Sequence, residues 1–174
     1  MEWYAKEIGL AYDTQMIDFG KGDNKKPAFL KINPFGKLPA IQTESGVPVF
    51  ESGAILLYLA DEYGGLKTSE ERATAAQWVL FANATLSPAM FNSAQRSTAM
   101  PALFAALENV LADKTFIAGD KFSVADVAVG AYLAYYGFFF PGEAARDMRA
   151  VKNVAAYLDR IKARKAFAET IGSE

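Results

Sequence analysis

The chain has 174 residues, of which 52% are hydrophobic, so it can bury a substantial core as one or two compact units. Its formal net charge of −2 gives no electrostatic reason to expect nucleic acid or an anionic membrane as a partner. The absence of cysteine and histidine excludes a disulfide framework, a cysteine nucleophile and the commonest metal ligands, so we expect no metal site.

Neither the start of the chain nor its apolar runs predict export or membrane insertion. The N-terminal sequence MEWYAKEIGL has scattered charges and no apolar core, unlike a secretory signal. The most apolar run, residues 127–140, is interrupted by glycine and tyrosine and is shorter than the roughly 20 residues of a spanning helix. We therefore expect a cytoplasmic protein.

The first thirty residues predict a helix, a strand and a short helical segment. Residues 1–8 read as the end of an amphipathic helix. Residues 12–19 alternate apolar and polar side chains, which is typical of a half-buried strand. After a polar loop, residues 27–31 are expected to be helical, with Phe29 and Leu30 facing inward.

Residues 33–63 then read as turn, strand, turn, strand and helix. Pro39 stands at the start of the first strand, where a proline leaves nearby main-chain groups free for a ligand. Ser45-Gly46 is a hairpin signal, and residues 47–50 form the second strand. Ser52 follows directly as a good N-cap for an apolar helix.

The residues around that helix start suit an amino-acid head group. The free N–H groups of a first helical turn beside Ser52 attract a carboxylate, and Glu51 could hold an ammonium group. An extended peptide could run from there along the backbone at Pro39, with Lys37 neutralising a carboxylate at its far end. The alternative is that Ser52 merely caps the helix and Glu51 merely stabilises its positive end.

After Gly64-Gly65 the pattern becomes entirely helical, which predicts two domains, residues 1–65 and 66–174. Thr68 and Glu71 fit a capping box at the head of a long helix that we expect to end near Ser87-Pro88. A second helix covers residues 97–114, with Pro101 in its first turn.

The last third of the chain predicts the central helix and a closing helix. Ser123 and Asp126 form a serine-and-acid capping box, so Asp126 is structural rather than catalytic. The aromatic run at residues 135–140 is expected to pack in the core, with the flank of a substrate pocket as the alternative. Residues 155–167 form an amphipathic closing helix.

Four of these stretches carry a resemblance to a known family: NPFGKLPA at 33–40, ESGAILLYLADEYG at 51–64, QWVLFANATLSPAMF at 77–91 and FIAGDKFSVADVAVGAYL at 116–133. Together they resemble the glutathione transferases, and the third is similar to the short, chi-like members of photosynthetic microbes. The resemblance implies an α/β thioredoxin-like domain followed by an all-α domain.

The resemblance also implies how glutathione would be held. Leu38 would bind the cysteinyl part through its backbone before a cis Pro39. Glu51 and Ser52 would hold the γ-glutamyl head, and Lys37 would lie near the glycyl carboxylate. Asn24 or Lys25 could also reach the glycyl end, although a solvated lysine pair is the alternative reading of Lys25-Lys26.

Transferases of this family begin with a strand and a loop that carries the serine, tyrosine or cysteine next to the glutathione thiolate. No residue of this sequence matches that loop, so the catalytic residue is not named. Because the strand lies in the middle of the family's sheet, its loss would leave backbone groups unpaired. We therefore expect a truncated sequence rather than a natural variant.

The function implied is conjugation of the glutathione thiolate to a small hydrophobic electrophile, without a metal, by a homodimer. Trp78 and Phe81 could line the electrophile pocket, or could simply be core aromatics. The alternative is a non-catalytic module that binds glutathione or a protein, as in translation-factor subunits. A thiol reductase of the same fold would be expected to use a cysteine, which this sequence lacks.

Overall fold

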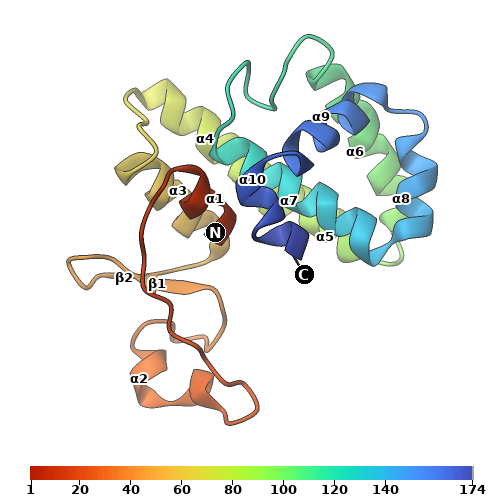
Figure 1. The fold of residues 1–174 in the computed structure, drawn as a ribbon. Coiled ribbons are helices and arrows are strands. Elements are labelled where there is room, and N and C mark those ends of the chain that lie inside the picture. The colour runs from red at the N-terminus through yellow and green to blue at the C-terminus, as the bar shows by residue number, and fades with distance from the viewer. Residues whose placement is uncertain (174) are drawn as a thin grey trace.

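The computed structural model describes residues 1–173, which form a small α/β part followed by an all-helical part. The hairpin and α2 extend away from the helical body (Figure 1). In chain order the elements are α1 (Glu2–Glu7), η1 (Asp23–Lys25), α2 (Pro27–Leu30), β1 (Ala40–Gln42), β2 (Pro48–Phe50), α3 (Ser52–Glu62), α4 (Ser69–Phe81), η2 (Ala82–Leu86), α5 (Ser87–Phe91), α6 (Arg96–Val110), α7 (Val124–Phe139), α8 (Pro141–Met148), α9 (Lys152–Lys162), α10 (Lys165–Ala168) and η3 (Ile171–Ser173).

The predicted hairpin is present. Strand β1 pairs antiparallel with β2, and Ile41 lies opposite Val49. Gly46 has φ +82°, a backbone angle that glycine adopts without strain, so the chain can turn there. The hairpin packs against α3, which fixes the start of that helix relative to β1.

The prediction of a strand at residues 12–19 is wrong. The segment has no regular structure, and its apolar side chains Tyr12, Met16 and Phe19 are exposed. A strand needs a neighbour for its N–H and C=O groups, and within the described residues only β1 and β2 pair as a sheet. The alternation of apolar and polar residues matched the two-residue period of a strand, but it could not show whether a neighbouring strand was present to pair with. Leu30 is also exposed, contrary to prediction, while Phe29 is buried.

The long helix after residue 68 starts as predicted and continues further than predicted. The capping box of Thr68 and Glu71 is complete, with both reciprocal hydrogen bonds. The helical path then runs through the π-helix η2 and on to Phe91, past the expected end at Ser87-Pro88. Pro88 causes no break because it lies in the first turn of α5, where its missing N–H is tolerated.

Helix α6 differs from its prediction in both bounds. It begins at Arg96, so Pro101 lies in the helix interior rather than in the first turn. It ends at Val110, before the predicted residue 114, and Leu111 caps it. The buried face of α6 consists of Met100, Phe104 and Leu107.

Helix α7 is the central helix, as predicted, and its capping box is present. Asp126 is fully buried, and its carboxylate accepts hydrogen bonds from the backbone N–H of Ile117 at 2.8 Å and from the Tyr157 hydroxyl at 3.1 Å. Burial raises the pKa of Asp126, although these hydrogen bonds oppose the shift. Its role is structural.

The aromatic run at residues 135–140 divides between core and surface. Tyr136 is fully buried and donates to Asp147 at 2.8 Å, as the core reading predicted. Phe138 and Phe139 are 66% and 51% exposed, so that reading is wrong for them. Helix α7 is therefore buried on several faces in its first half, and it exposes the rings of Phe138 and Phe139 at its C-terminal end.

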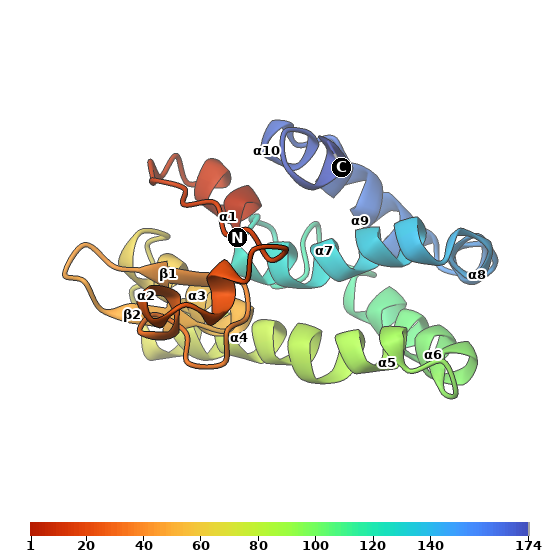
Figure 2. The same ribbon diagram turned by 90° about the horizontal axis from the view of Figure 1, so that it is seen from below.

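Both ends of the chain contribute to one hydrophobic core. Trp3 of α1 is 1% exposed, and its ring contacts Phe122 and Phe167 at centroid distances of 5.7 and 5.1 Å. Figure 2 shows α1 beside α10, with α7 below them. Arg164 donates two hydrogen bonds to the carboxylate of Glu7, at 2.7 and 2.6 Å. The α/β part is thus attached to the helical part through α1 as well as α3.

In residues 1–173, no single helix is long and apolar enough to cross a membrane. Helices α7 and α8 taken together are long and apolar enough to do so, but the two are bent by 119° relative to each other. The same residues contain no group of three acidic side chains placed to hold a metal ion.

Candidate functional site

The loop before β1 is held by two asparagine side chains. Asn33 is buried and donates to the carbonyl of Lys37 at 2.7 Å, while its Oδ1 accepts from the N–H of Phe35 at 3.0 Å. Asn24 donates to the carbonyl of Gly36 at 2.8 Å. Because Asn24 is buried in this bond, it supports the loop and does not extend toward a ligand.

That loop presents the first part of the predicted site. The Leu38–Pro39 peptide bond is cis, as the resemblance implied. Lys37 is exposed and Leu38 is 48% exposed, directly before β1. The hydrogen bonds of Asn33 hold the backbone between residues 33 and 37 in place.

The second part lies where β2 meets α3. Glu51 has φ +69° and ψ 125°, and within the described residues it is the one non-glycine residue with a positive φ. Such a conformation costs about 1–3 kcal/mol and occurs most often at functional sites. It turns the chain sharply enough for α3 to begin at Ser52, with the Glu51 carboxylate exposed next to it.

Ser52 does not cap α3, contrary to prediction. The N-cap residue is Glu51, and no described side chain accepts a hydrogen bond from the first turn. The leading N–H groups of α3 are therefore available to an anion, and the positive end of the helix dipole favours one. The reading of Ser52 as a simple cap is excluded.

The Ser52 hydroxyl instead contacts the helical part of the protein. Its Oγ accepts a long hydrogen bond of 3.4 Å from Nδ2 of Asn83, and Oδ1 of Asn83 accepts from the Tyr132 hydroxyl at 3.2 Å. Asn83 lies in η2 and Tyr132 in α7, so three elements meet here. Sequence reasoning did not assign Asn83 to the site; the signal that could have found it is an amide directly after the apolar run at residues 78–82.

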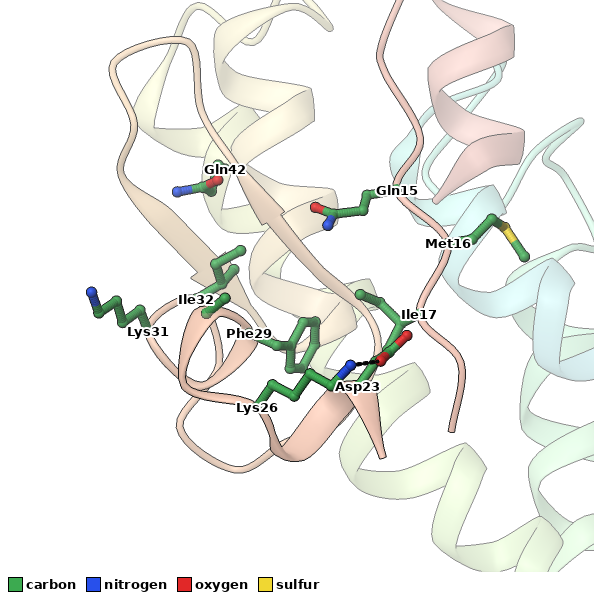
Figure 3. A pocket seen from close by; sticks show the side chains of 10 residues that line it. Gln15, Met16, Ile17, Asp23, Lys26, Phe29, Lys31, Ile32 and Gln42 are labelled. Carbon is green, nitrogen blue, oxygen red and sulfur yellow. Dashed lines mark ion pairs between the residues drawn. The ribbon is translucent and has the colours of Figure 1, made fainter. Parts of the chain in front are cut away.

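The described residues also line two pockets. One, of about 580 Å³, lies between the extended segment before η1, helix α2 and strand β1 (Figure 3). Phe29, Ile17 and Met16 are among the residues that line it, and the end of the Met16 side chain points away from the other labelled side chains. It includes none of the predicted residues Lys37, Leu38, Pro39, Glu51 and Ser52.

The other pocket, of about 290 Å³, is aromatic and apolar with one cationic residue. It lies between the end of α7 and the last elements of the chain. Phe138 and Phe139 contribute exposed rings, and Lys162 is its charged residue. Trp78 and Phe81 are not part of this pocket; they are half-buried and pack edge to face at 5.6 Å.

Comparison with known proteins agrees with this architecture. The family model for the N-terminal domain of glutathione S-transferase matches residues 1–61, and that for the C-terminal domain matches residues 93–160. The disulfide-bond oxidoreductase YfcG of Escherichia coli is 35% identical over 148 residues, which are 72% of this chain and 69% of that protein. The chain belongs to the glutathione S-transferase family.

Further relatives of this transferase-family chain cover nearly its full length. Glutathione S-transferase F9 of Arabidopsis thaliana is 28% identical over 95% of this chain and 87% of its own. A crystal structure of a glutathione transferase from Burkholderia graminis, with two glutathione molecules bound per subunit, is 29% identical, with a TM-score of 0.84 over 99% of this chain and 82% of its own.

Proposed function

We propose that this chain binds glutathione at the loop before β1 and at the start of α3. The observation that carries the proposal is the uncapped first turn of α3 beside the strained, exposed Glu51. A carboxylate placed at that turn has free N–H donors and a favourable dipole, and an ammonium group has Glu51. Glutathione bound to the similar Burkholderia graminis transferase supports this choice of ligand.

The rest of the tripeptide has matching groups at the other part of the site. The cysteinyl residue would lie extended along the backbone of Leu38, before Pro39 and β1. Peptides that bind in this way are held by main-chain hydrogen bonds. Lys37 is exposed and would neutralise the glycyl carboxylate.

We further propose that the bound thiolate attacks a small hydrophobic electrophile. In this conjugation the thiolate sulfur forms a bond to carbon, the leaving group departs with the bonding electrons, and the thiol proton passes to solvent. The apolar pocket lined by Phe138 and Phe139 would bind the electrophile, and Lys162 would favour one that carries or develops negative charge.

Glutathione-dependent disulfide reduction is a second candidate. It is favoured by the similarity to YfcG, which is a disulfide-bond oxidoreductase, and by the two glutathione molecules in the Burkholderia graminis structure. Two glutathione thiols would be oxidised to one glutathione disulfide while the substrate disulfide is reduced to two thiols. Since the chain has no cysteine, both reducing thiols would come from glutathione, in place of the protein cysteine that we expected.

Calorimetric titration with glutathione tests the binding proposal. We expect Glu51→Gln and Ser52→Ala each to weaken binding about tenfold, because each removes one charge-assisted contact. Glu62→Gln, an exposed acid at the other end of α3, is the matched control and should bind as the unsubstituted protein does. Equal affinity in all four proteins would contradict the site.

Turnover assays then separate the two reactions. Absorbance assays with 1-chloro-2,4-dinitrobenzene report conjugation, and assays with 2-hydroxyethyl disulfide report reduction. Both assays should use this chain at a glutathione concentration that saturates the binding seen by calorimetry. If only the disulfide is turned over, conjugation is rejected. If the protein binds glutathione but turns over neither substrate, the non-catalytic module is favoured.

A further inference from the structure

Asn83 connects the start of α3 to the central helix of the other half of the protein. Its amide lies between two hydroxyl groups, Ser52 Oγ at 3.4 Å and the Tyr132 oxygen at 3.2 Å. All three side chains are half-buried, so bulk water competes only partly for these bonds. The three residues come from α3, η2 and α7.

The backbone around Asn83 is shaped for this contact. Asn83 is the second residue of the π-helix η2, and such insertions shift the side chains of a helix relative to a regular α-helical path. Gly53, next to Ser52, leaves the room: a Cβ atom there would lie 2.6 Å from Asn83 Nδ2 and 3.0 Å from a methyl group of Val79. An alanine at 53 would push the amide away.

The direction of the hydrogen bonds decides where the Ser52 proton points. The Tyr132 hydroxyl donates to Asn83 Oδ1, which leaves Nδ2 to donate to Ser52. A serine hydroxyl has one proton, and its oxygen here already accepts from Asn83. The proton is therefore free to point away from Asn83, toward an anion at the first turn of α3.

We propose that Asn83 is a positioning residue that orients the Ser52 hydroxyl to donate to the α-carboxylate of the γ-glutamyl group. This inference rests on the proposed function, and it adds that glutathione affinity depends on the helical half of the protein. Asn83 does not touch the ligand. It acts through Ser52, and Tyr132 acts through Asn83.

The test compares two ligands by calorimetry: glutathione and γ-aminobutyryl-cysteinylglycine, which lacks that carboxylate. Asn83→Ala should bind glutathione about tenfold more weakly and the analogue with unchanged affinity. Asn83→Asp should lose more glutathione affinity than Asn83→Ala. Its carboxylate can only accept the Ser52 proton, which turns that proton away from the ligand, and it also repels the carboxylate of glutathione. Tyr132→Phe keeps the ring and should weaken glutathione binding a few-fold, with no change for the analogue.

Thr85→Ala, an exposed position in the same π-helix, is the matched control and should leave both affinities unchanged. If Asn83→Ala and Tyr132→Phe weaken both ligands equally, the role of Asn83 is structural and the inference is overturned while the proposed function stands. If the unsubstituted protein binds neither ligand, the proposed function is overturned together with it.

Discussion

Glu51 has a backbone conformation that lowers the stability of the fold and places a carboxylate at the proposed site. Its φ of +69° is a conformation that side chains with a Cβ rarely adopt, and its exposed carboxylate is held at the end of β2 by that conformation. A glycine would adopt the same angle without strain. The proposed ammonium contact needs this carboxylate, which a glycine would lack.

Replacement of Glu51 separates strain from charge. Glu51→Gly should be more stable than Glu51→Ala by about 1 kcal/mol, because only glycine relieves the positive φ. Both variants lack the carboxylate, so both should bind glutathione equally weakly. Urea unfolding measures the first difference and calorimetry the second. A glycine variant no more stable than the alanine variant would show that the backbone at 51 is unstrained.

At the scale of elements, the contact between α1 and α10 depends on pH. Burial would raise the pKa of the Glu7 carboxyl, but hydrogen bonds from Arg164 and Trp3 outweigh it and lower the pKa. The native state therefore favours the ionised carboxylate. This stabilisation is complete above the ordinary pKa of glutamate, about 4.3, and is lost as the pH falls through the lower native value.

Glu7→Gln should be less stable than the unsubstituted protein by about 2 kcal/mol at pH 7, since a charge-assisted pair is lost. The difference should shrink as the pH falls below about 4.3, because the unfolded chain then takes up a proton that the native carboxylate still resists. Urea unfolding at several pH values measures it, with Glu70→Gln, an exposed acid on α4, as the control. A difference that is the same at pH 7 and pH 3 would refute the assignment.

Elements with local signals were predictable from the sequence, and elements that need a distant neighbour were not. The capping boxes of α4 and α7 and the hairpin each depend on residues within a few positions of one another. The failed strand at residues 12–19 required a pairing partner that its own alternation cannot reveal. Asn83 lies 31 residues from Ser52, so its contact appears only once α3 packs against α4.

For the molecule as a whole, a single hydrophobic core extends across the predicted domain boundary between residues 65 and 66. Trp3 and Tyr4 of α1 and Ile55 and Leu59 of α3 are buried in one cluster with the side chains of the helical part. Burial of each such side chain contributes about 1.5–3 kcal/mol. Together they approach the net stability of about 5–15 kcal/mol that is usual for a domain.

Residues 66–174 expressed alone should therefore lack a cooperative unfolding transition, although every helix from α4 onward is included. Circular dichroism during urea titration measures this, and the intact chain is the control. A sharp transition for the fragment, with a midpoint close to that of the intact chain, would show that α1 and α3 add little to the core.

Trp3 also gives the protein a built-in optical reporter. The chain has two tryptophans: Trp3, which is 1% exposed where α1 meets α10, and Trp78, which is half-buried on α4. In a Trp78→Phe variant, all indole fluorescence would come from the place where the first and last helices touch. A red shift of that emission would signal that α1 had come away, even while the remaining helices kept their circular dichroism.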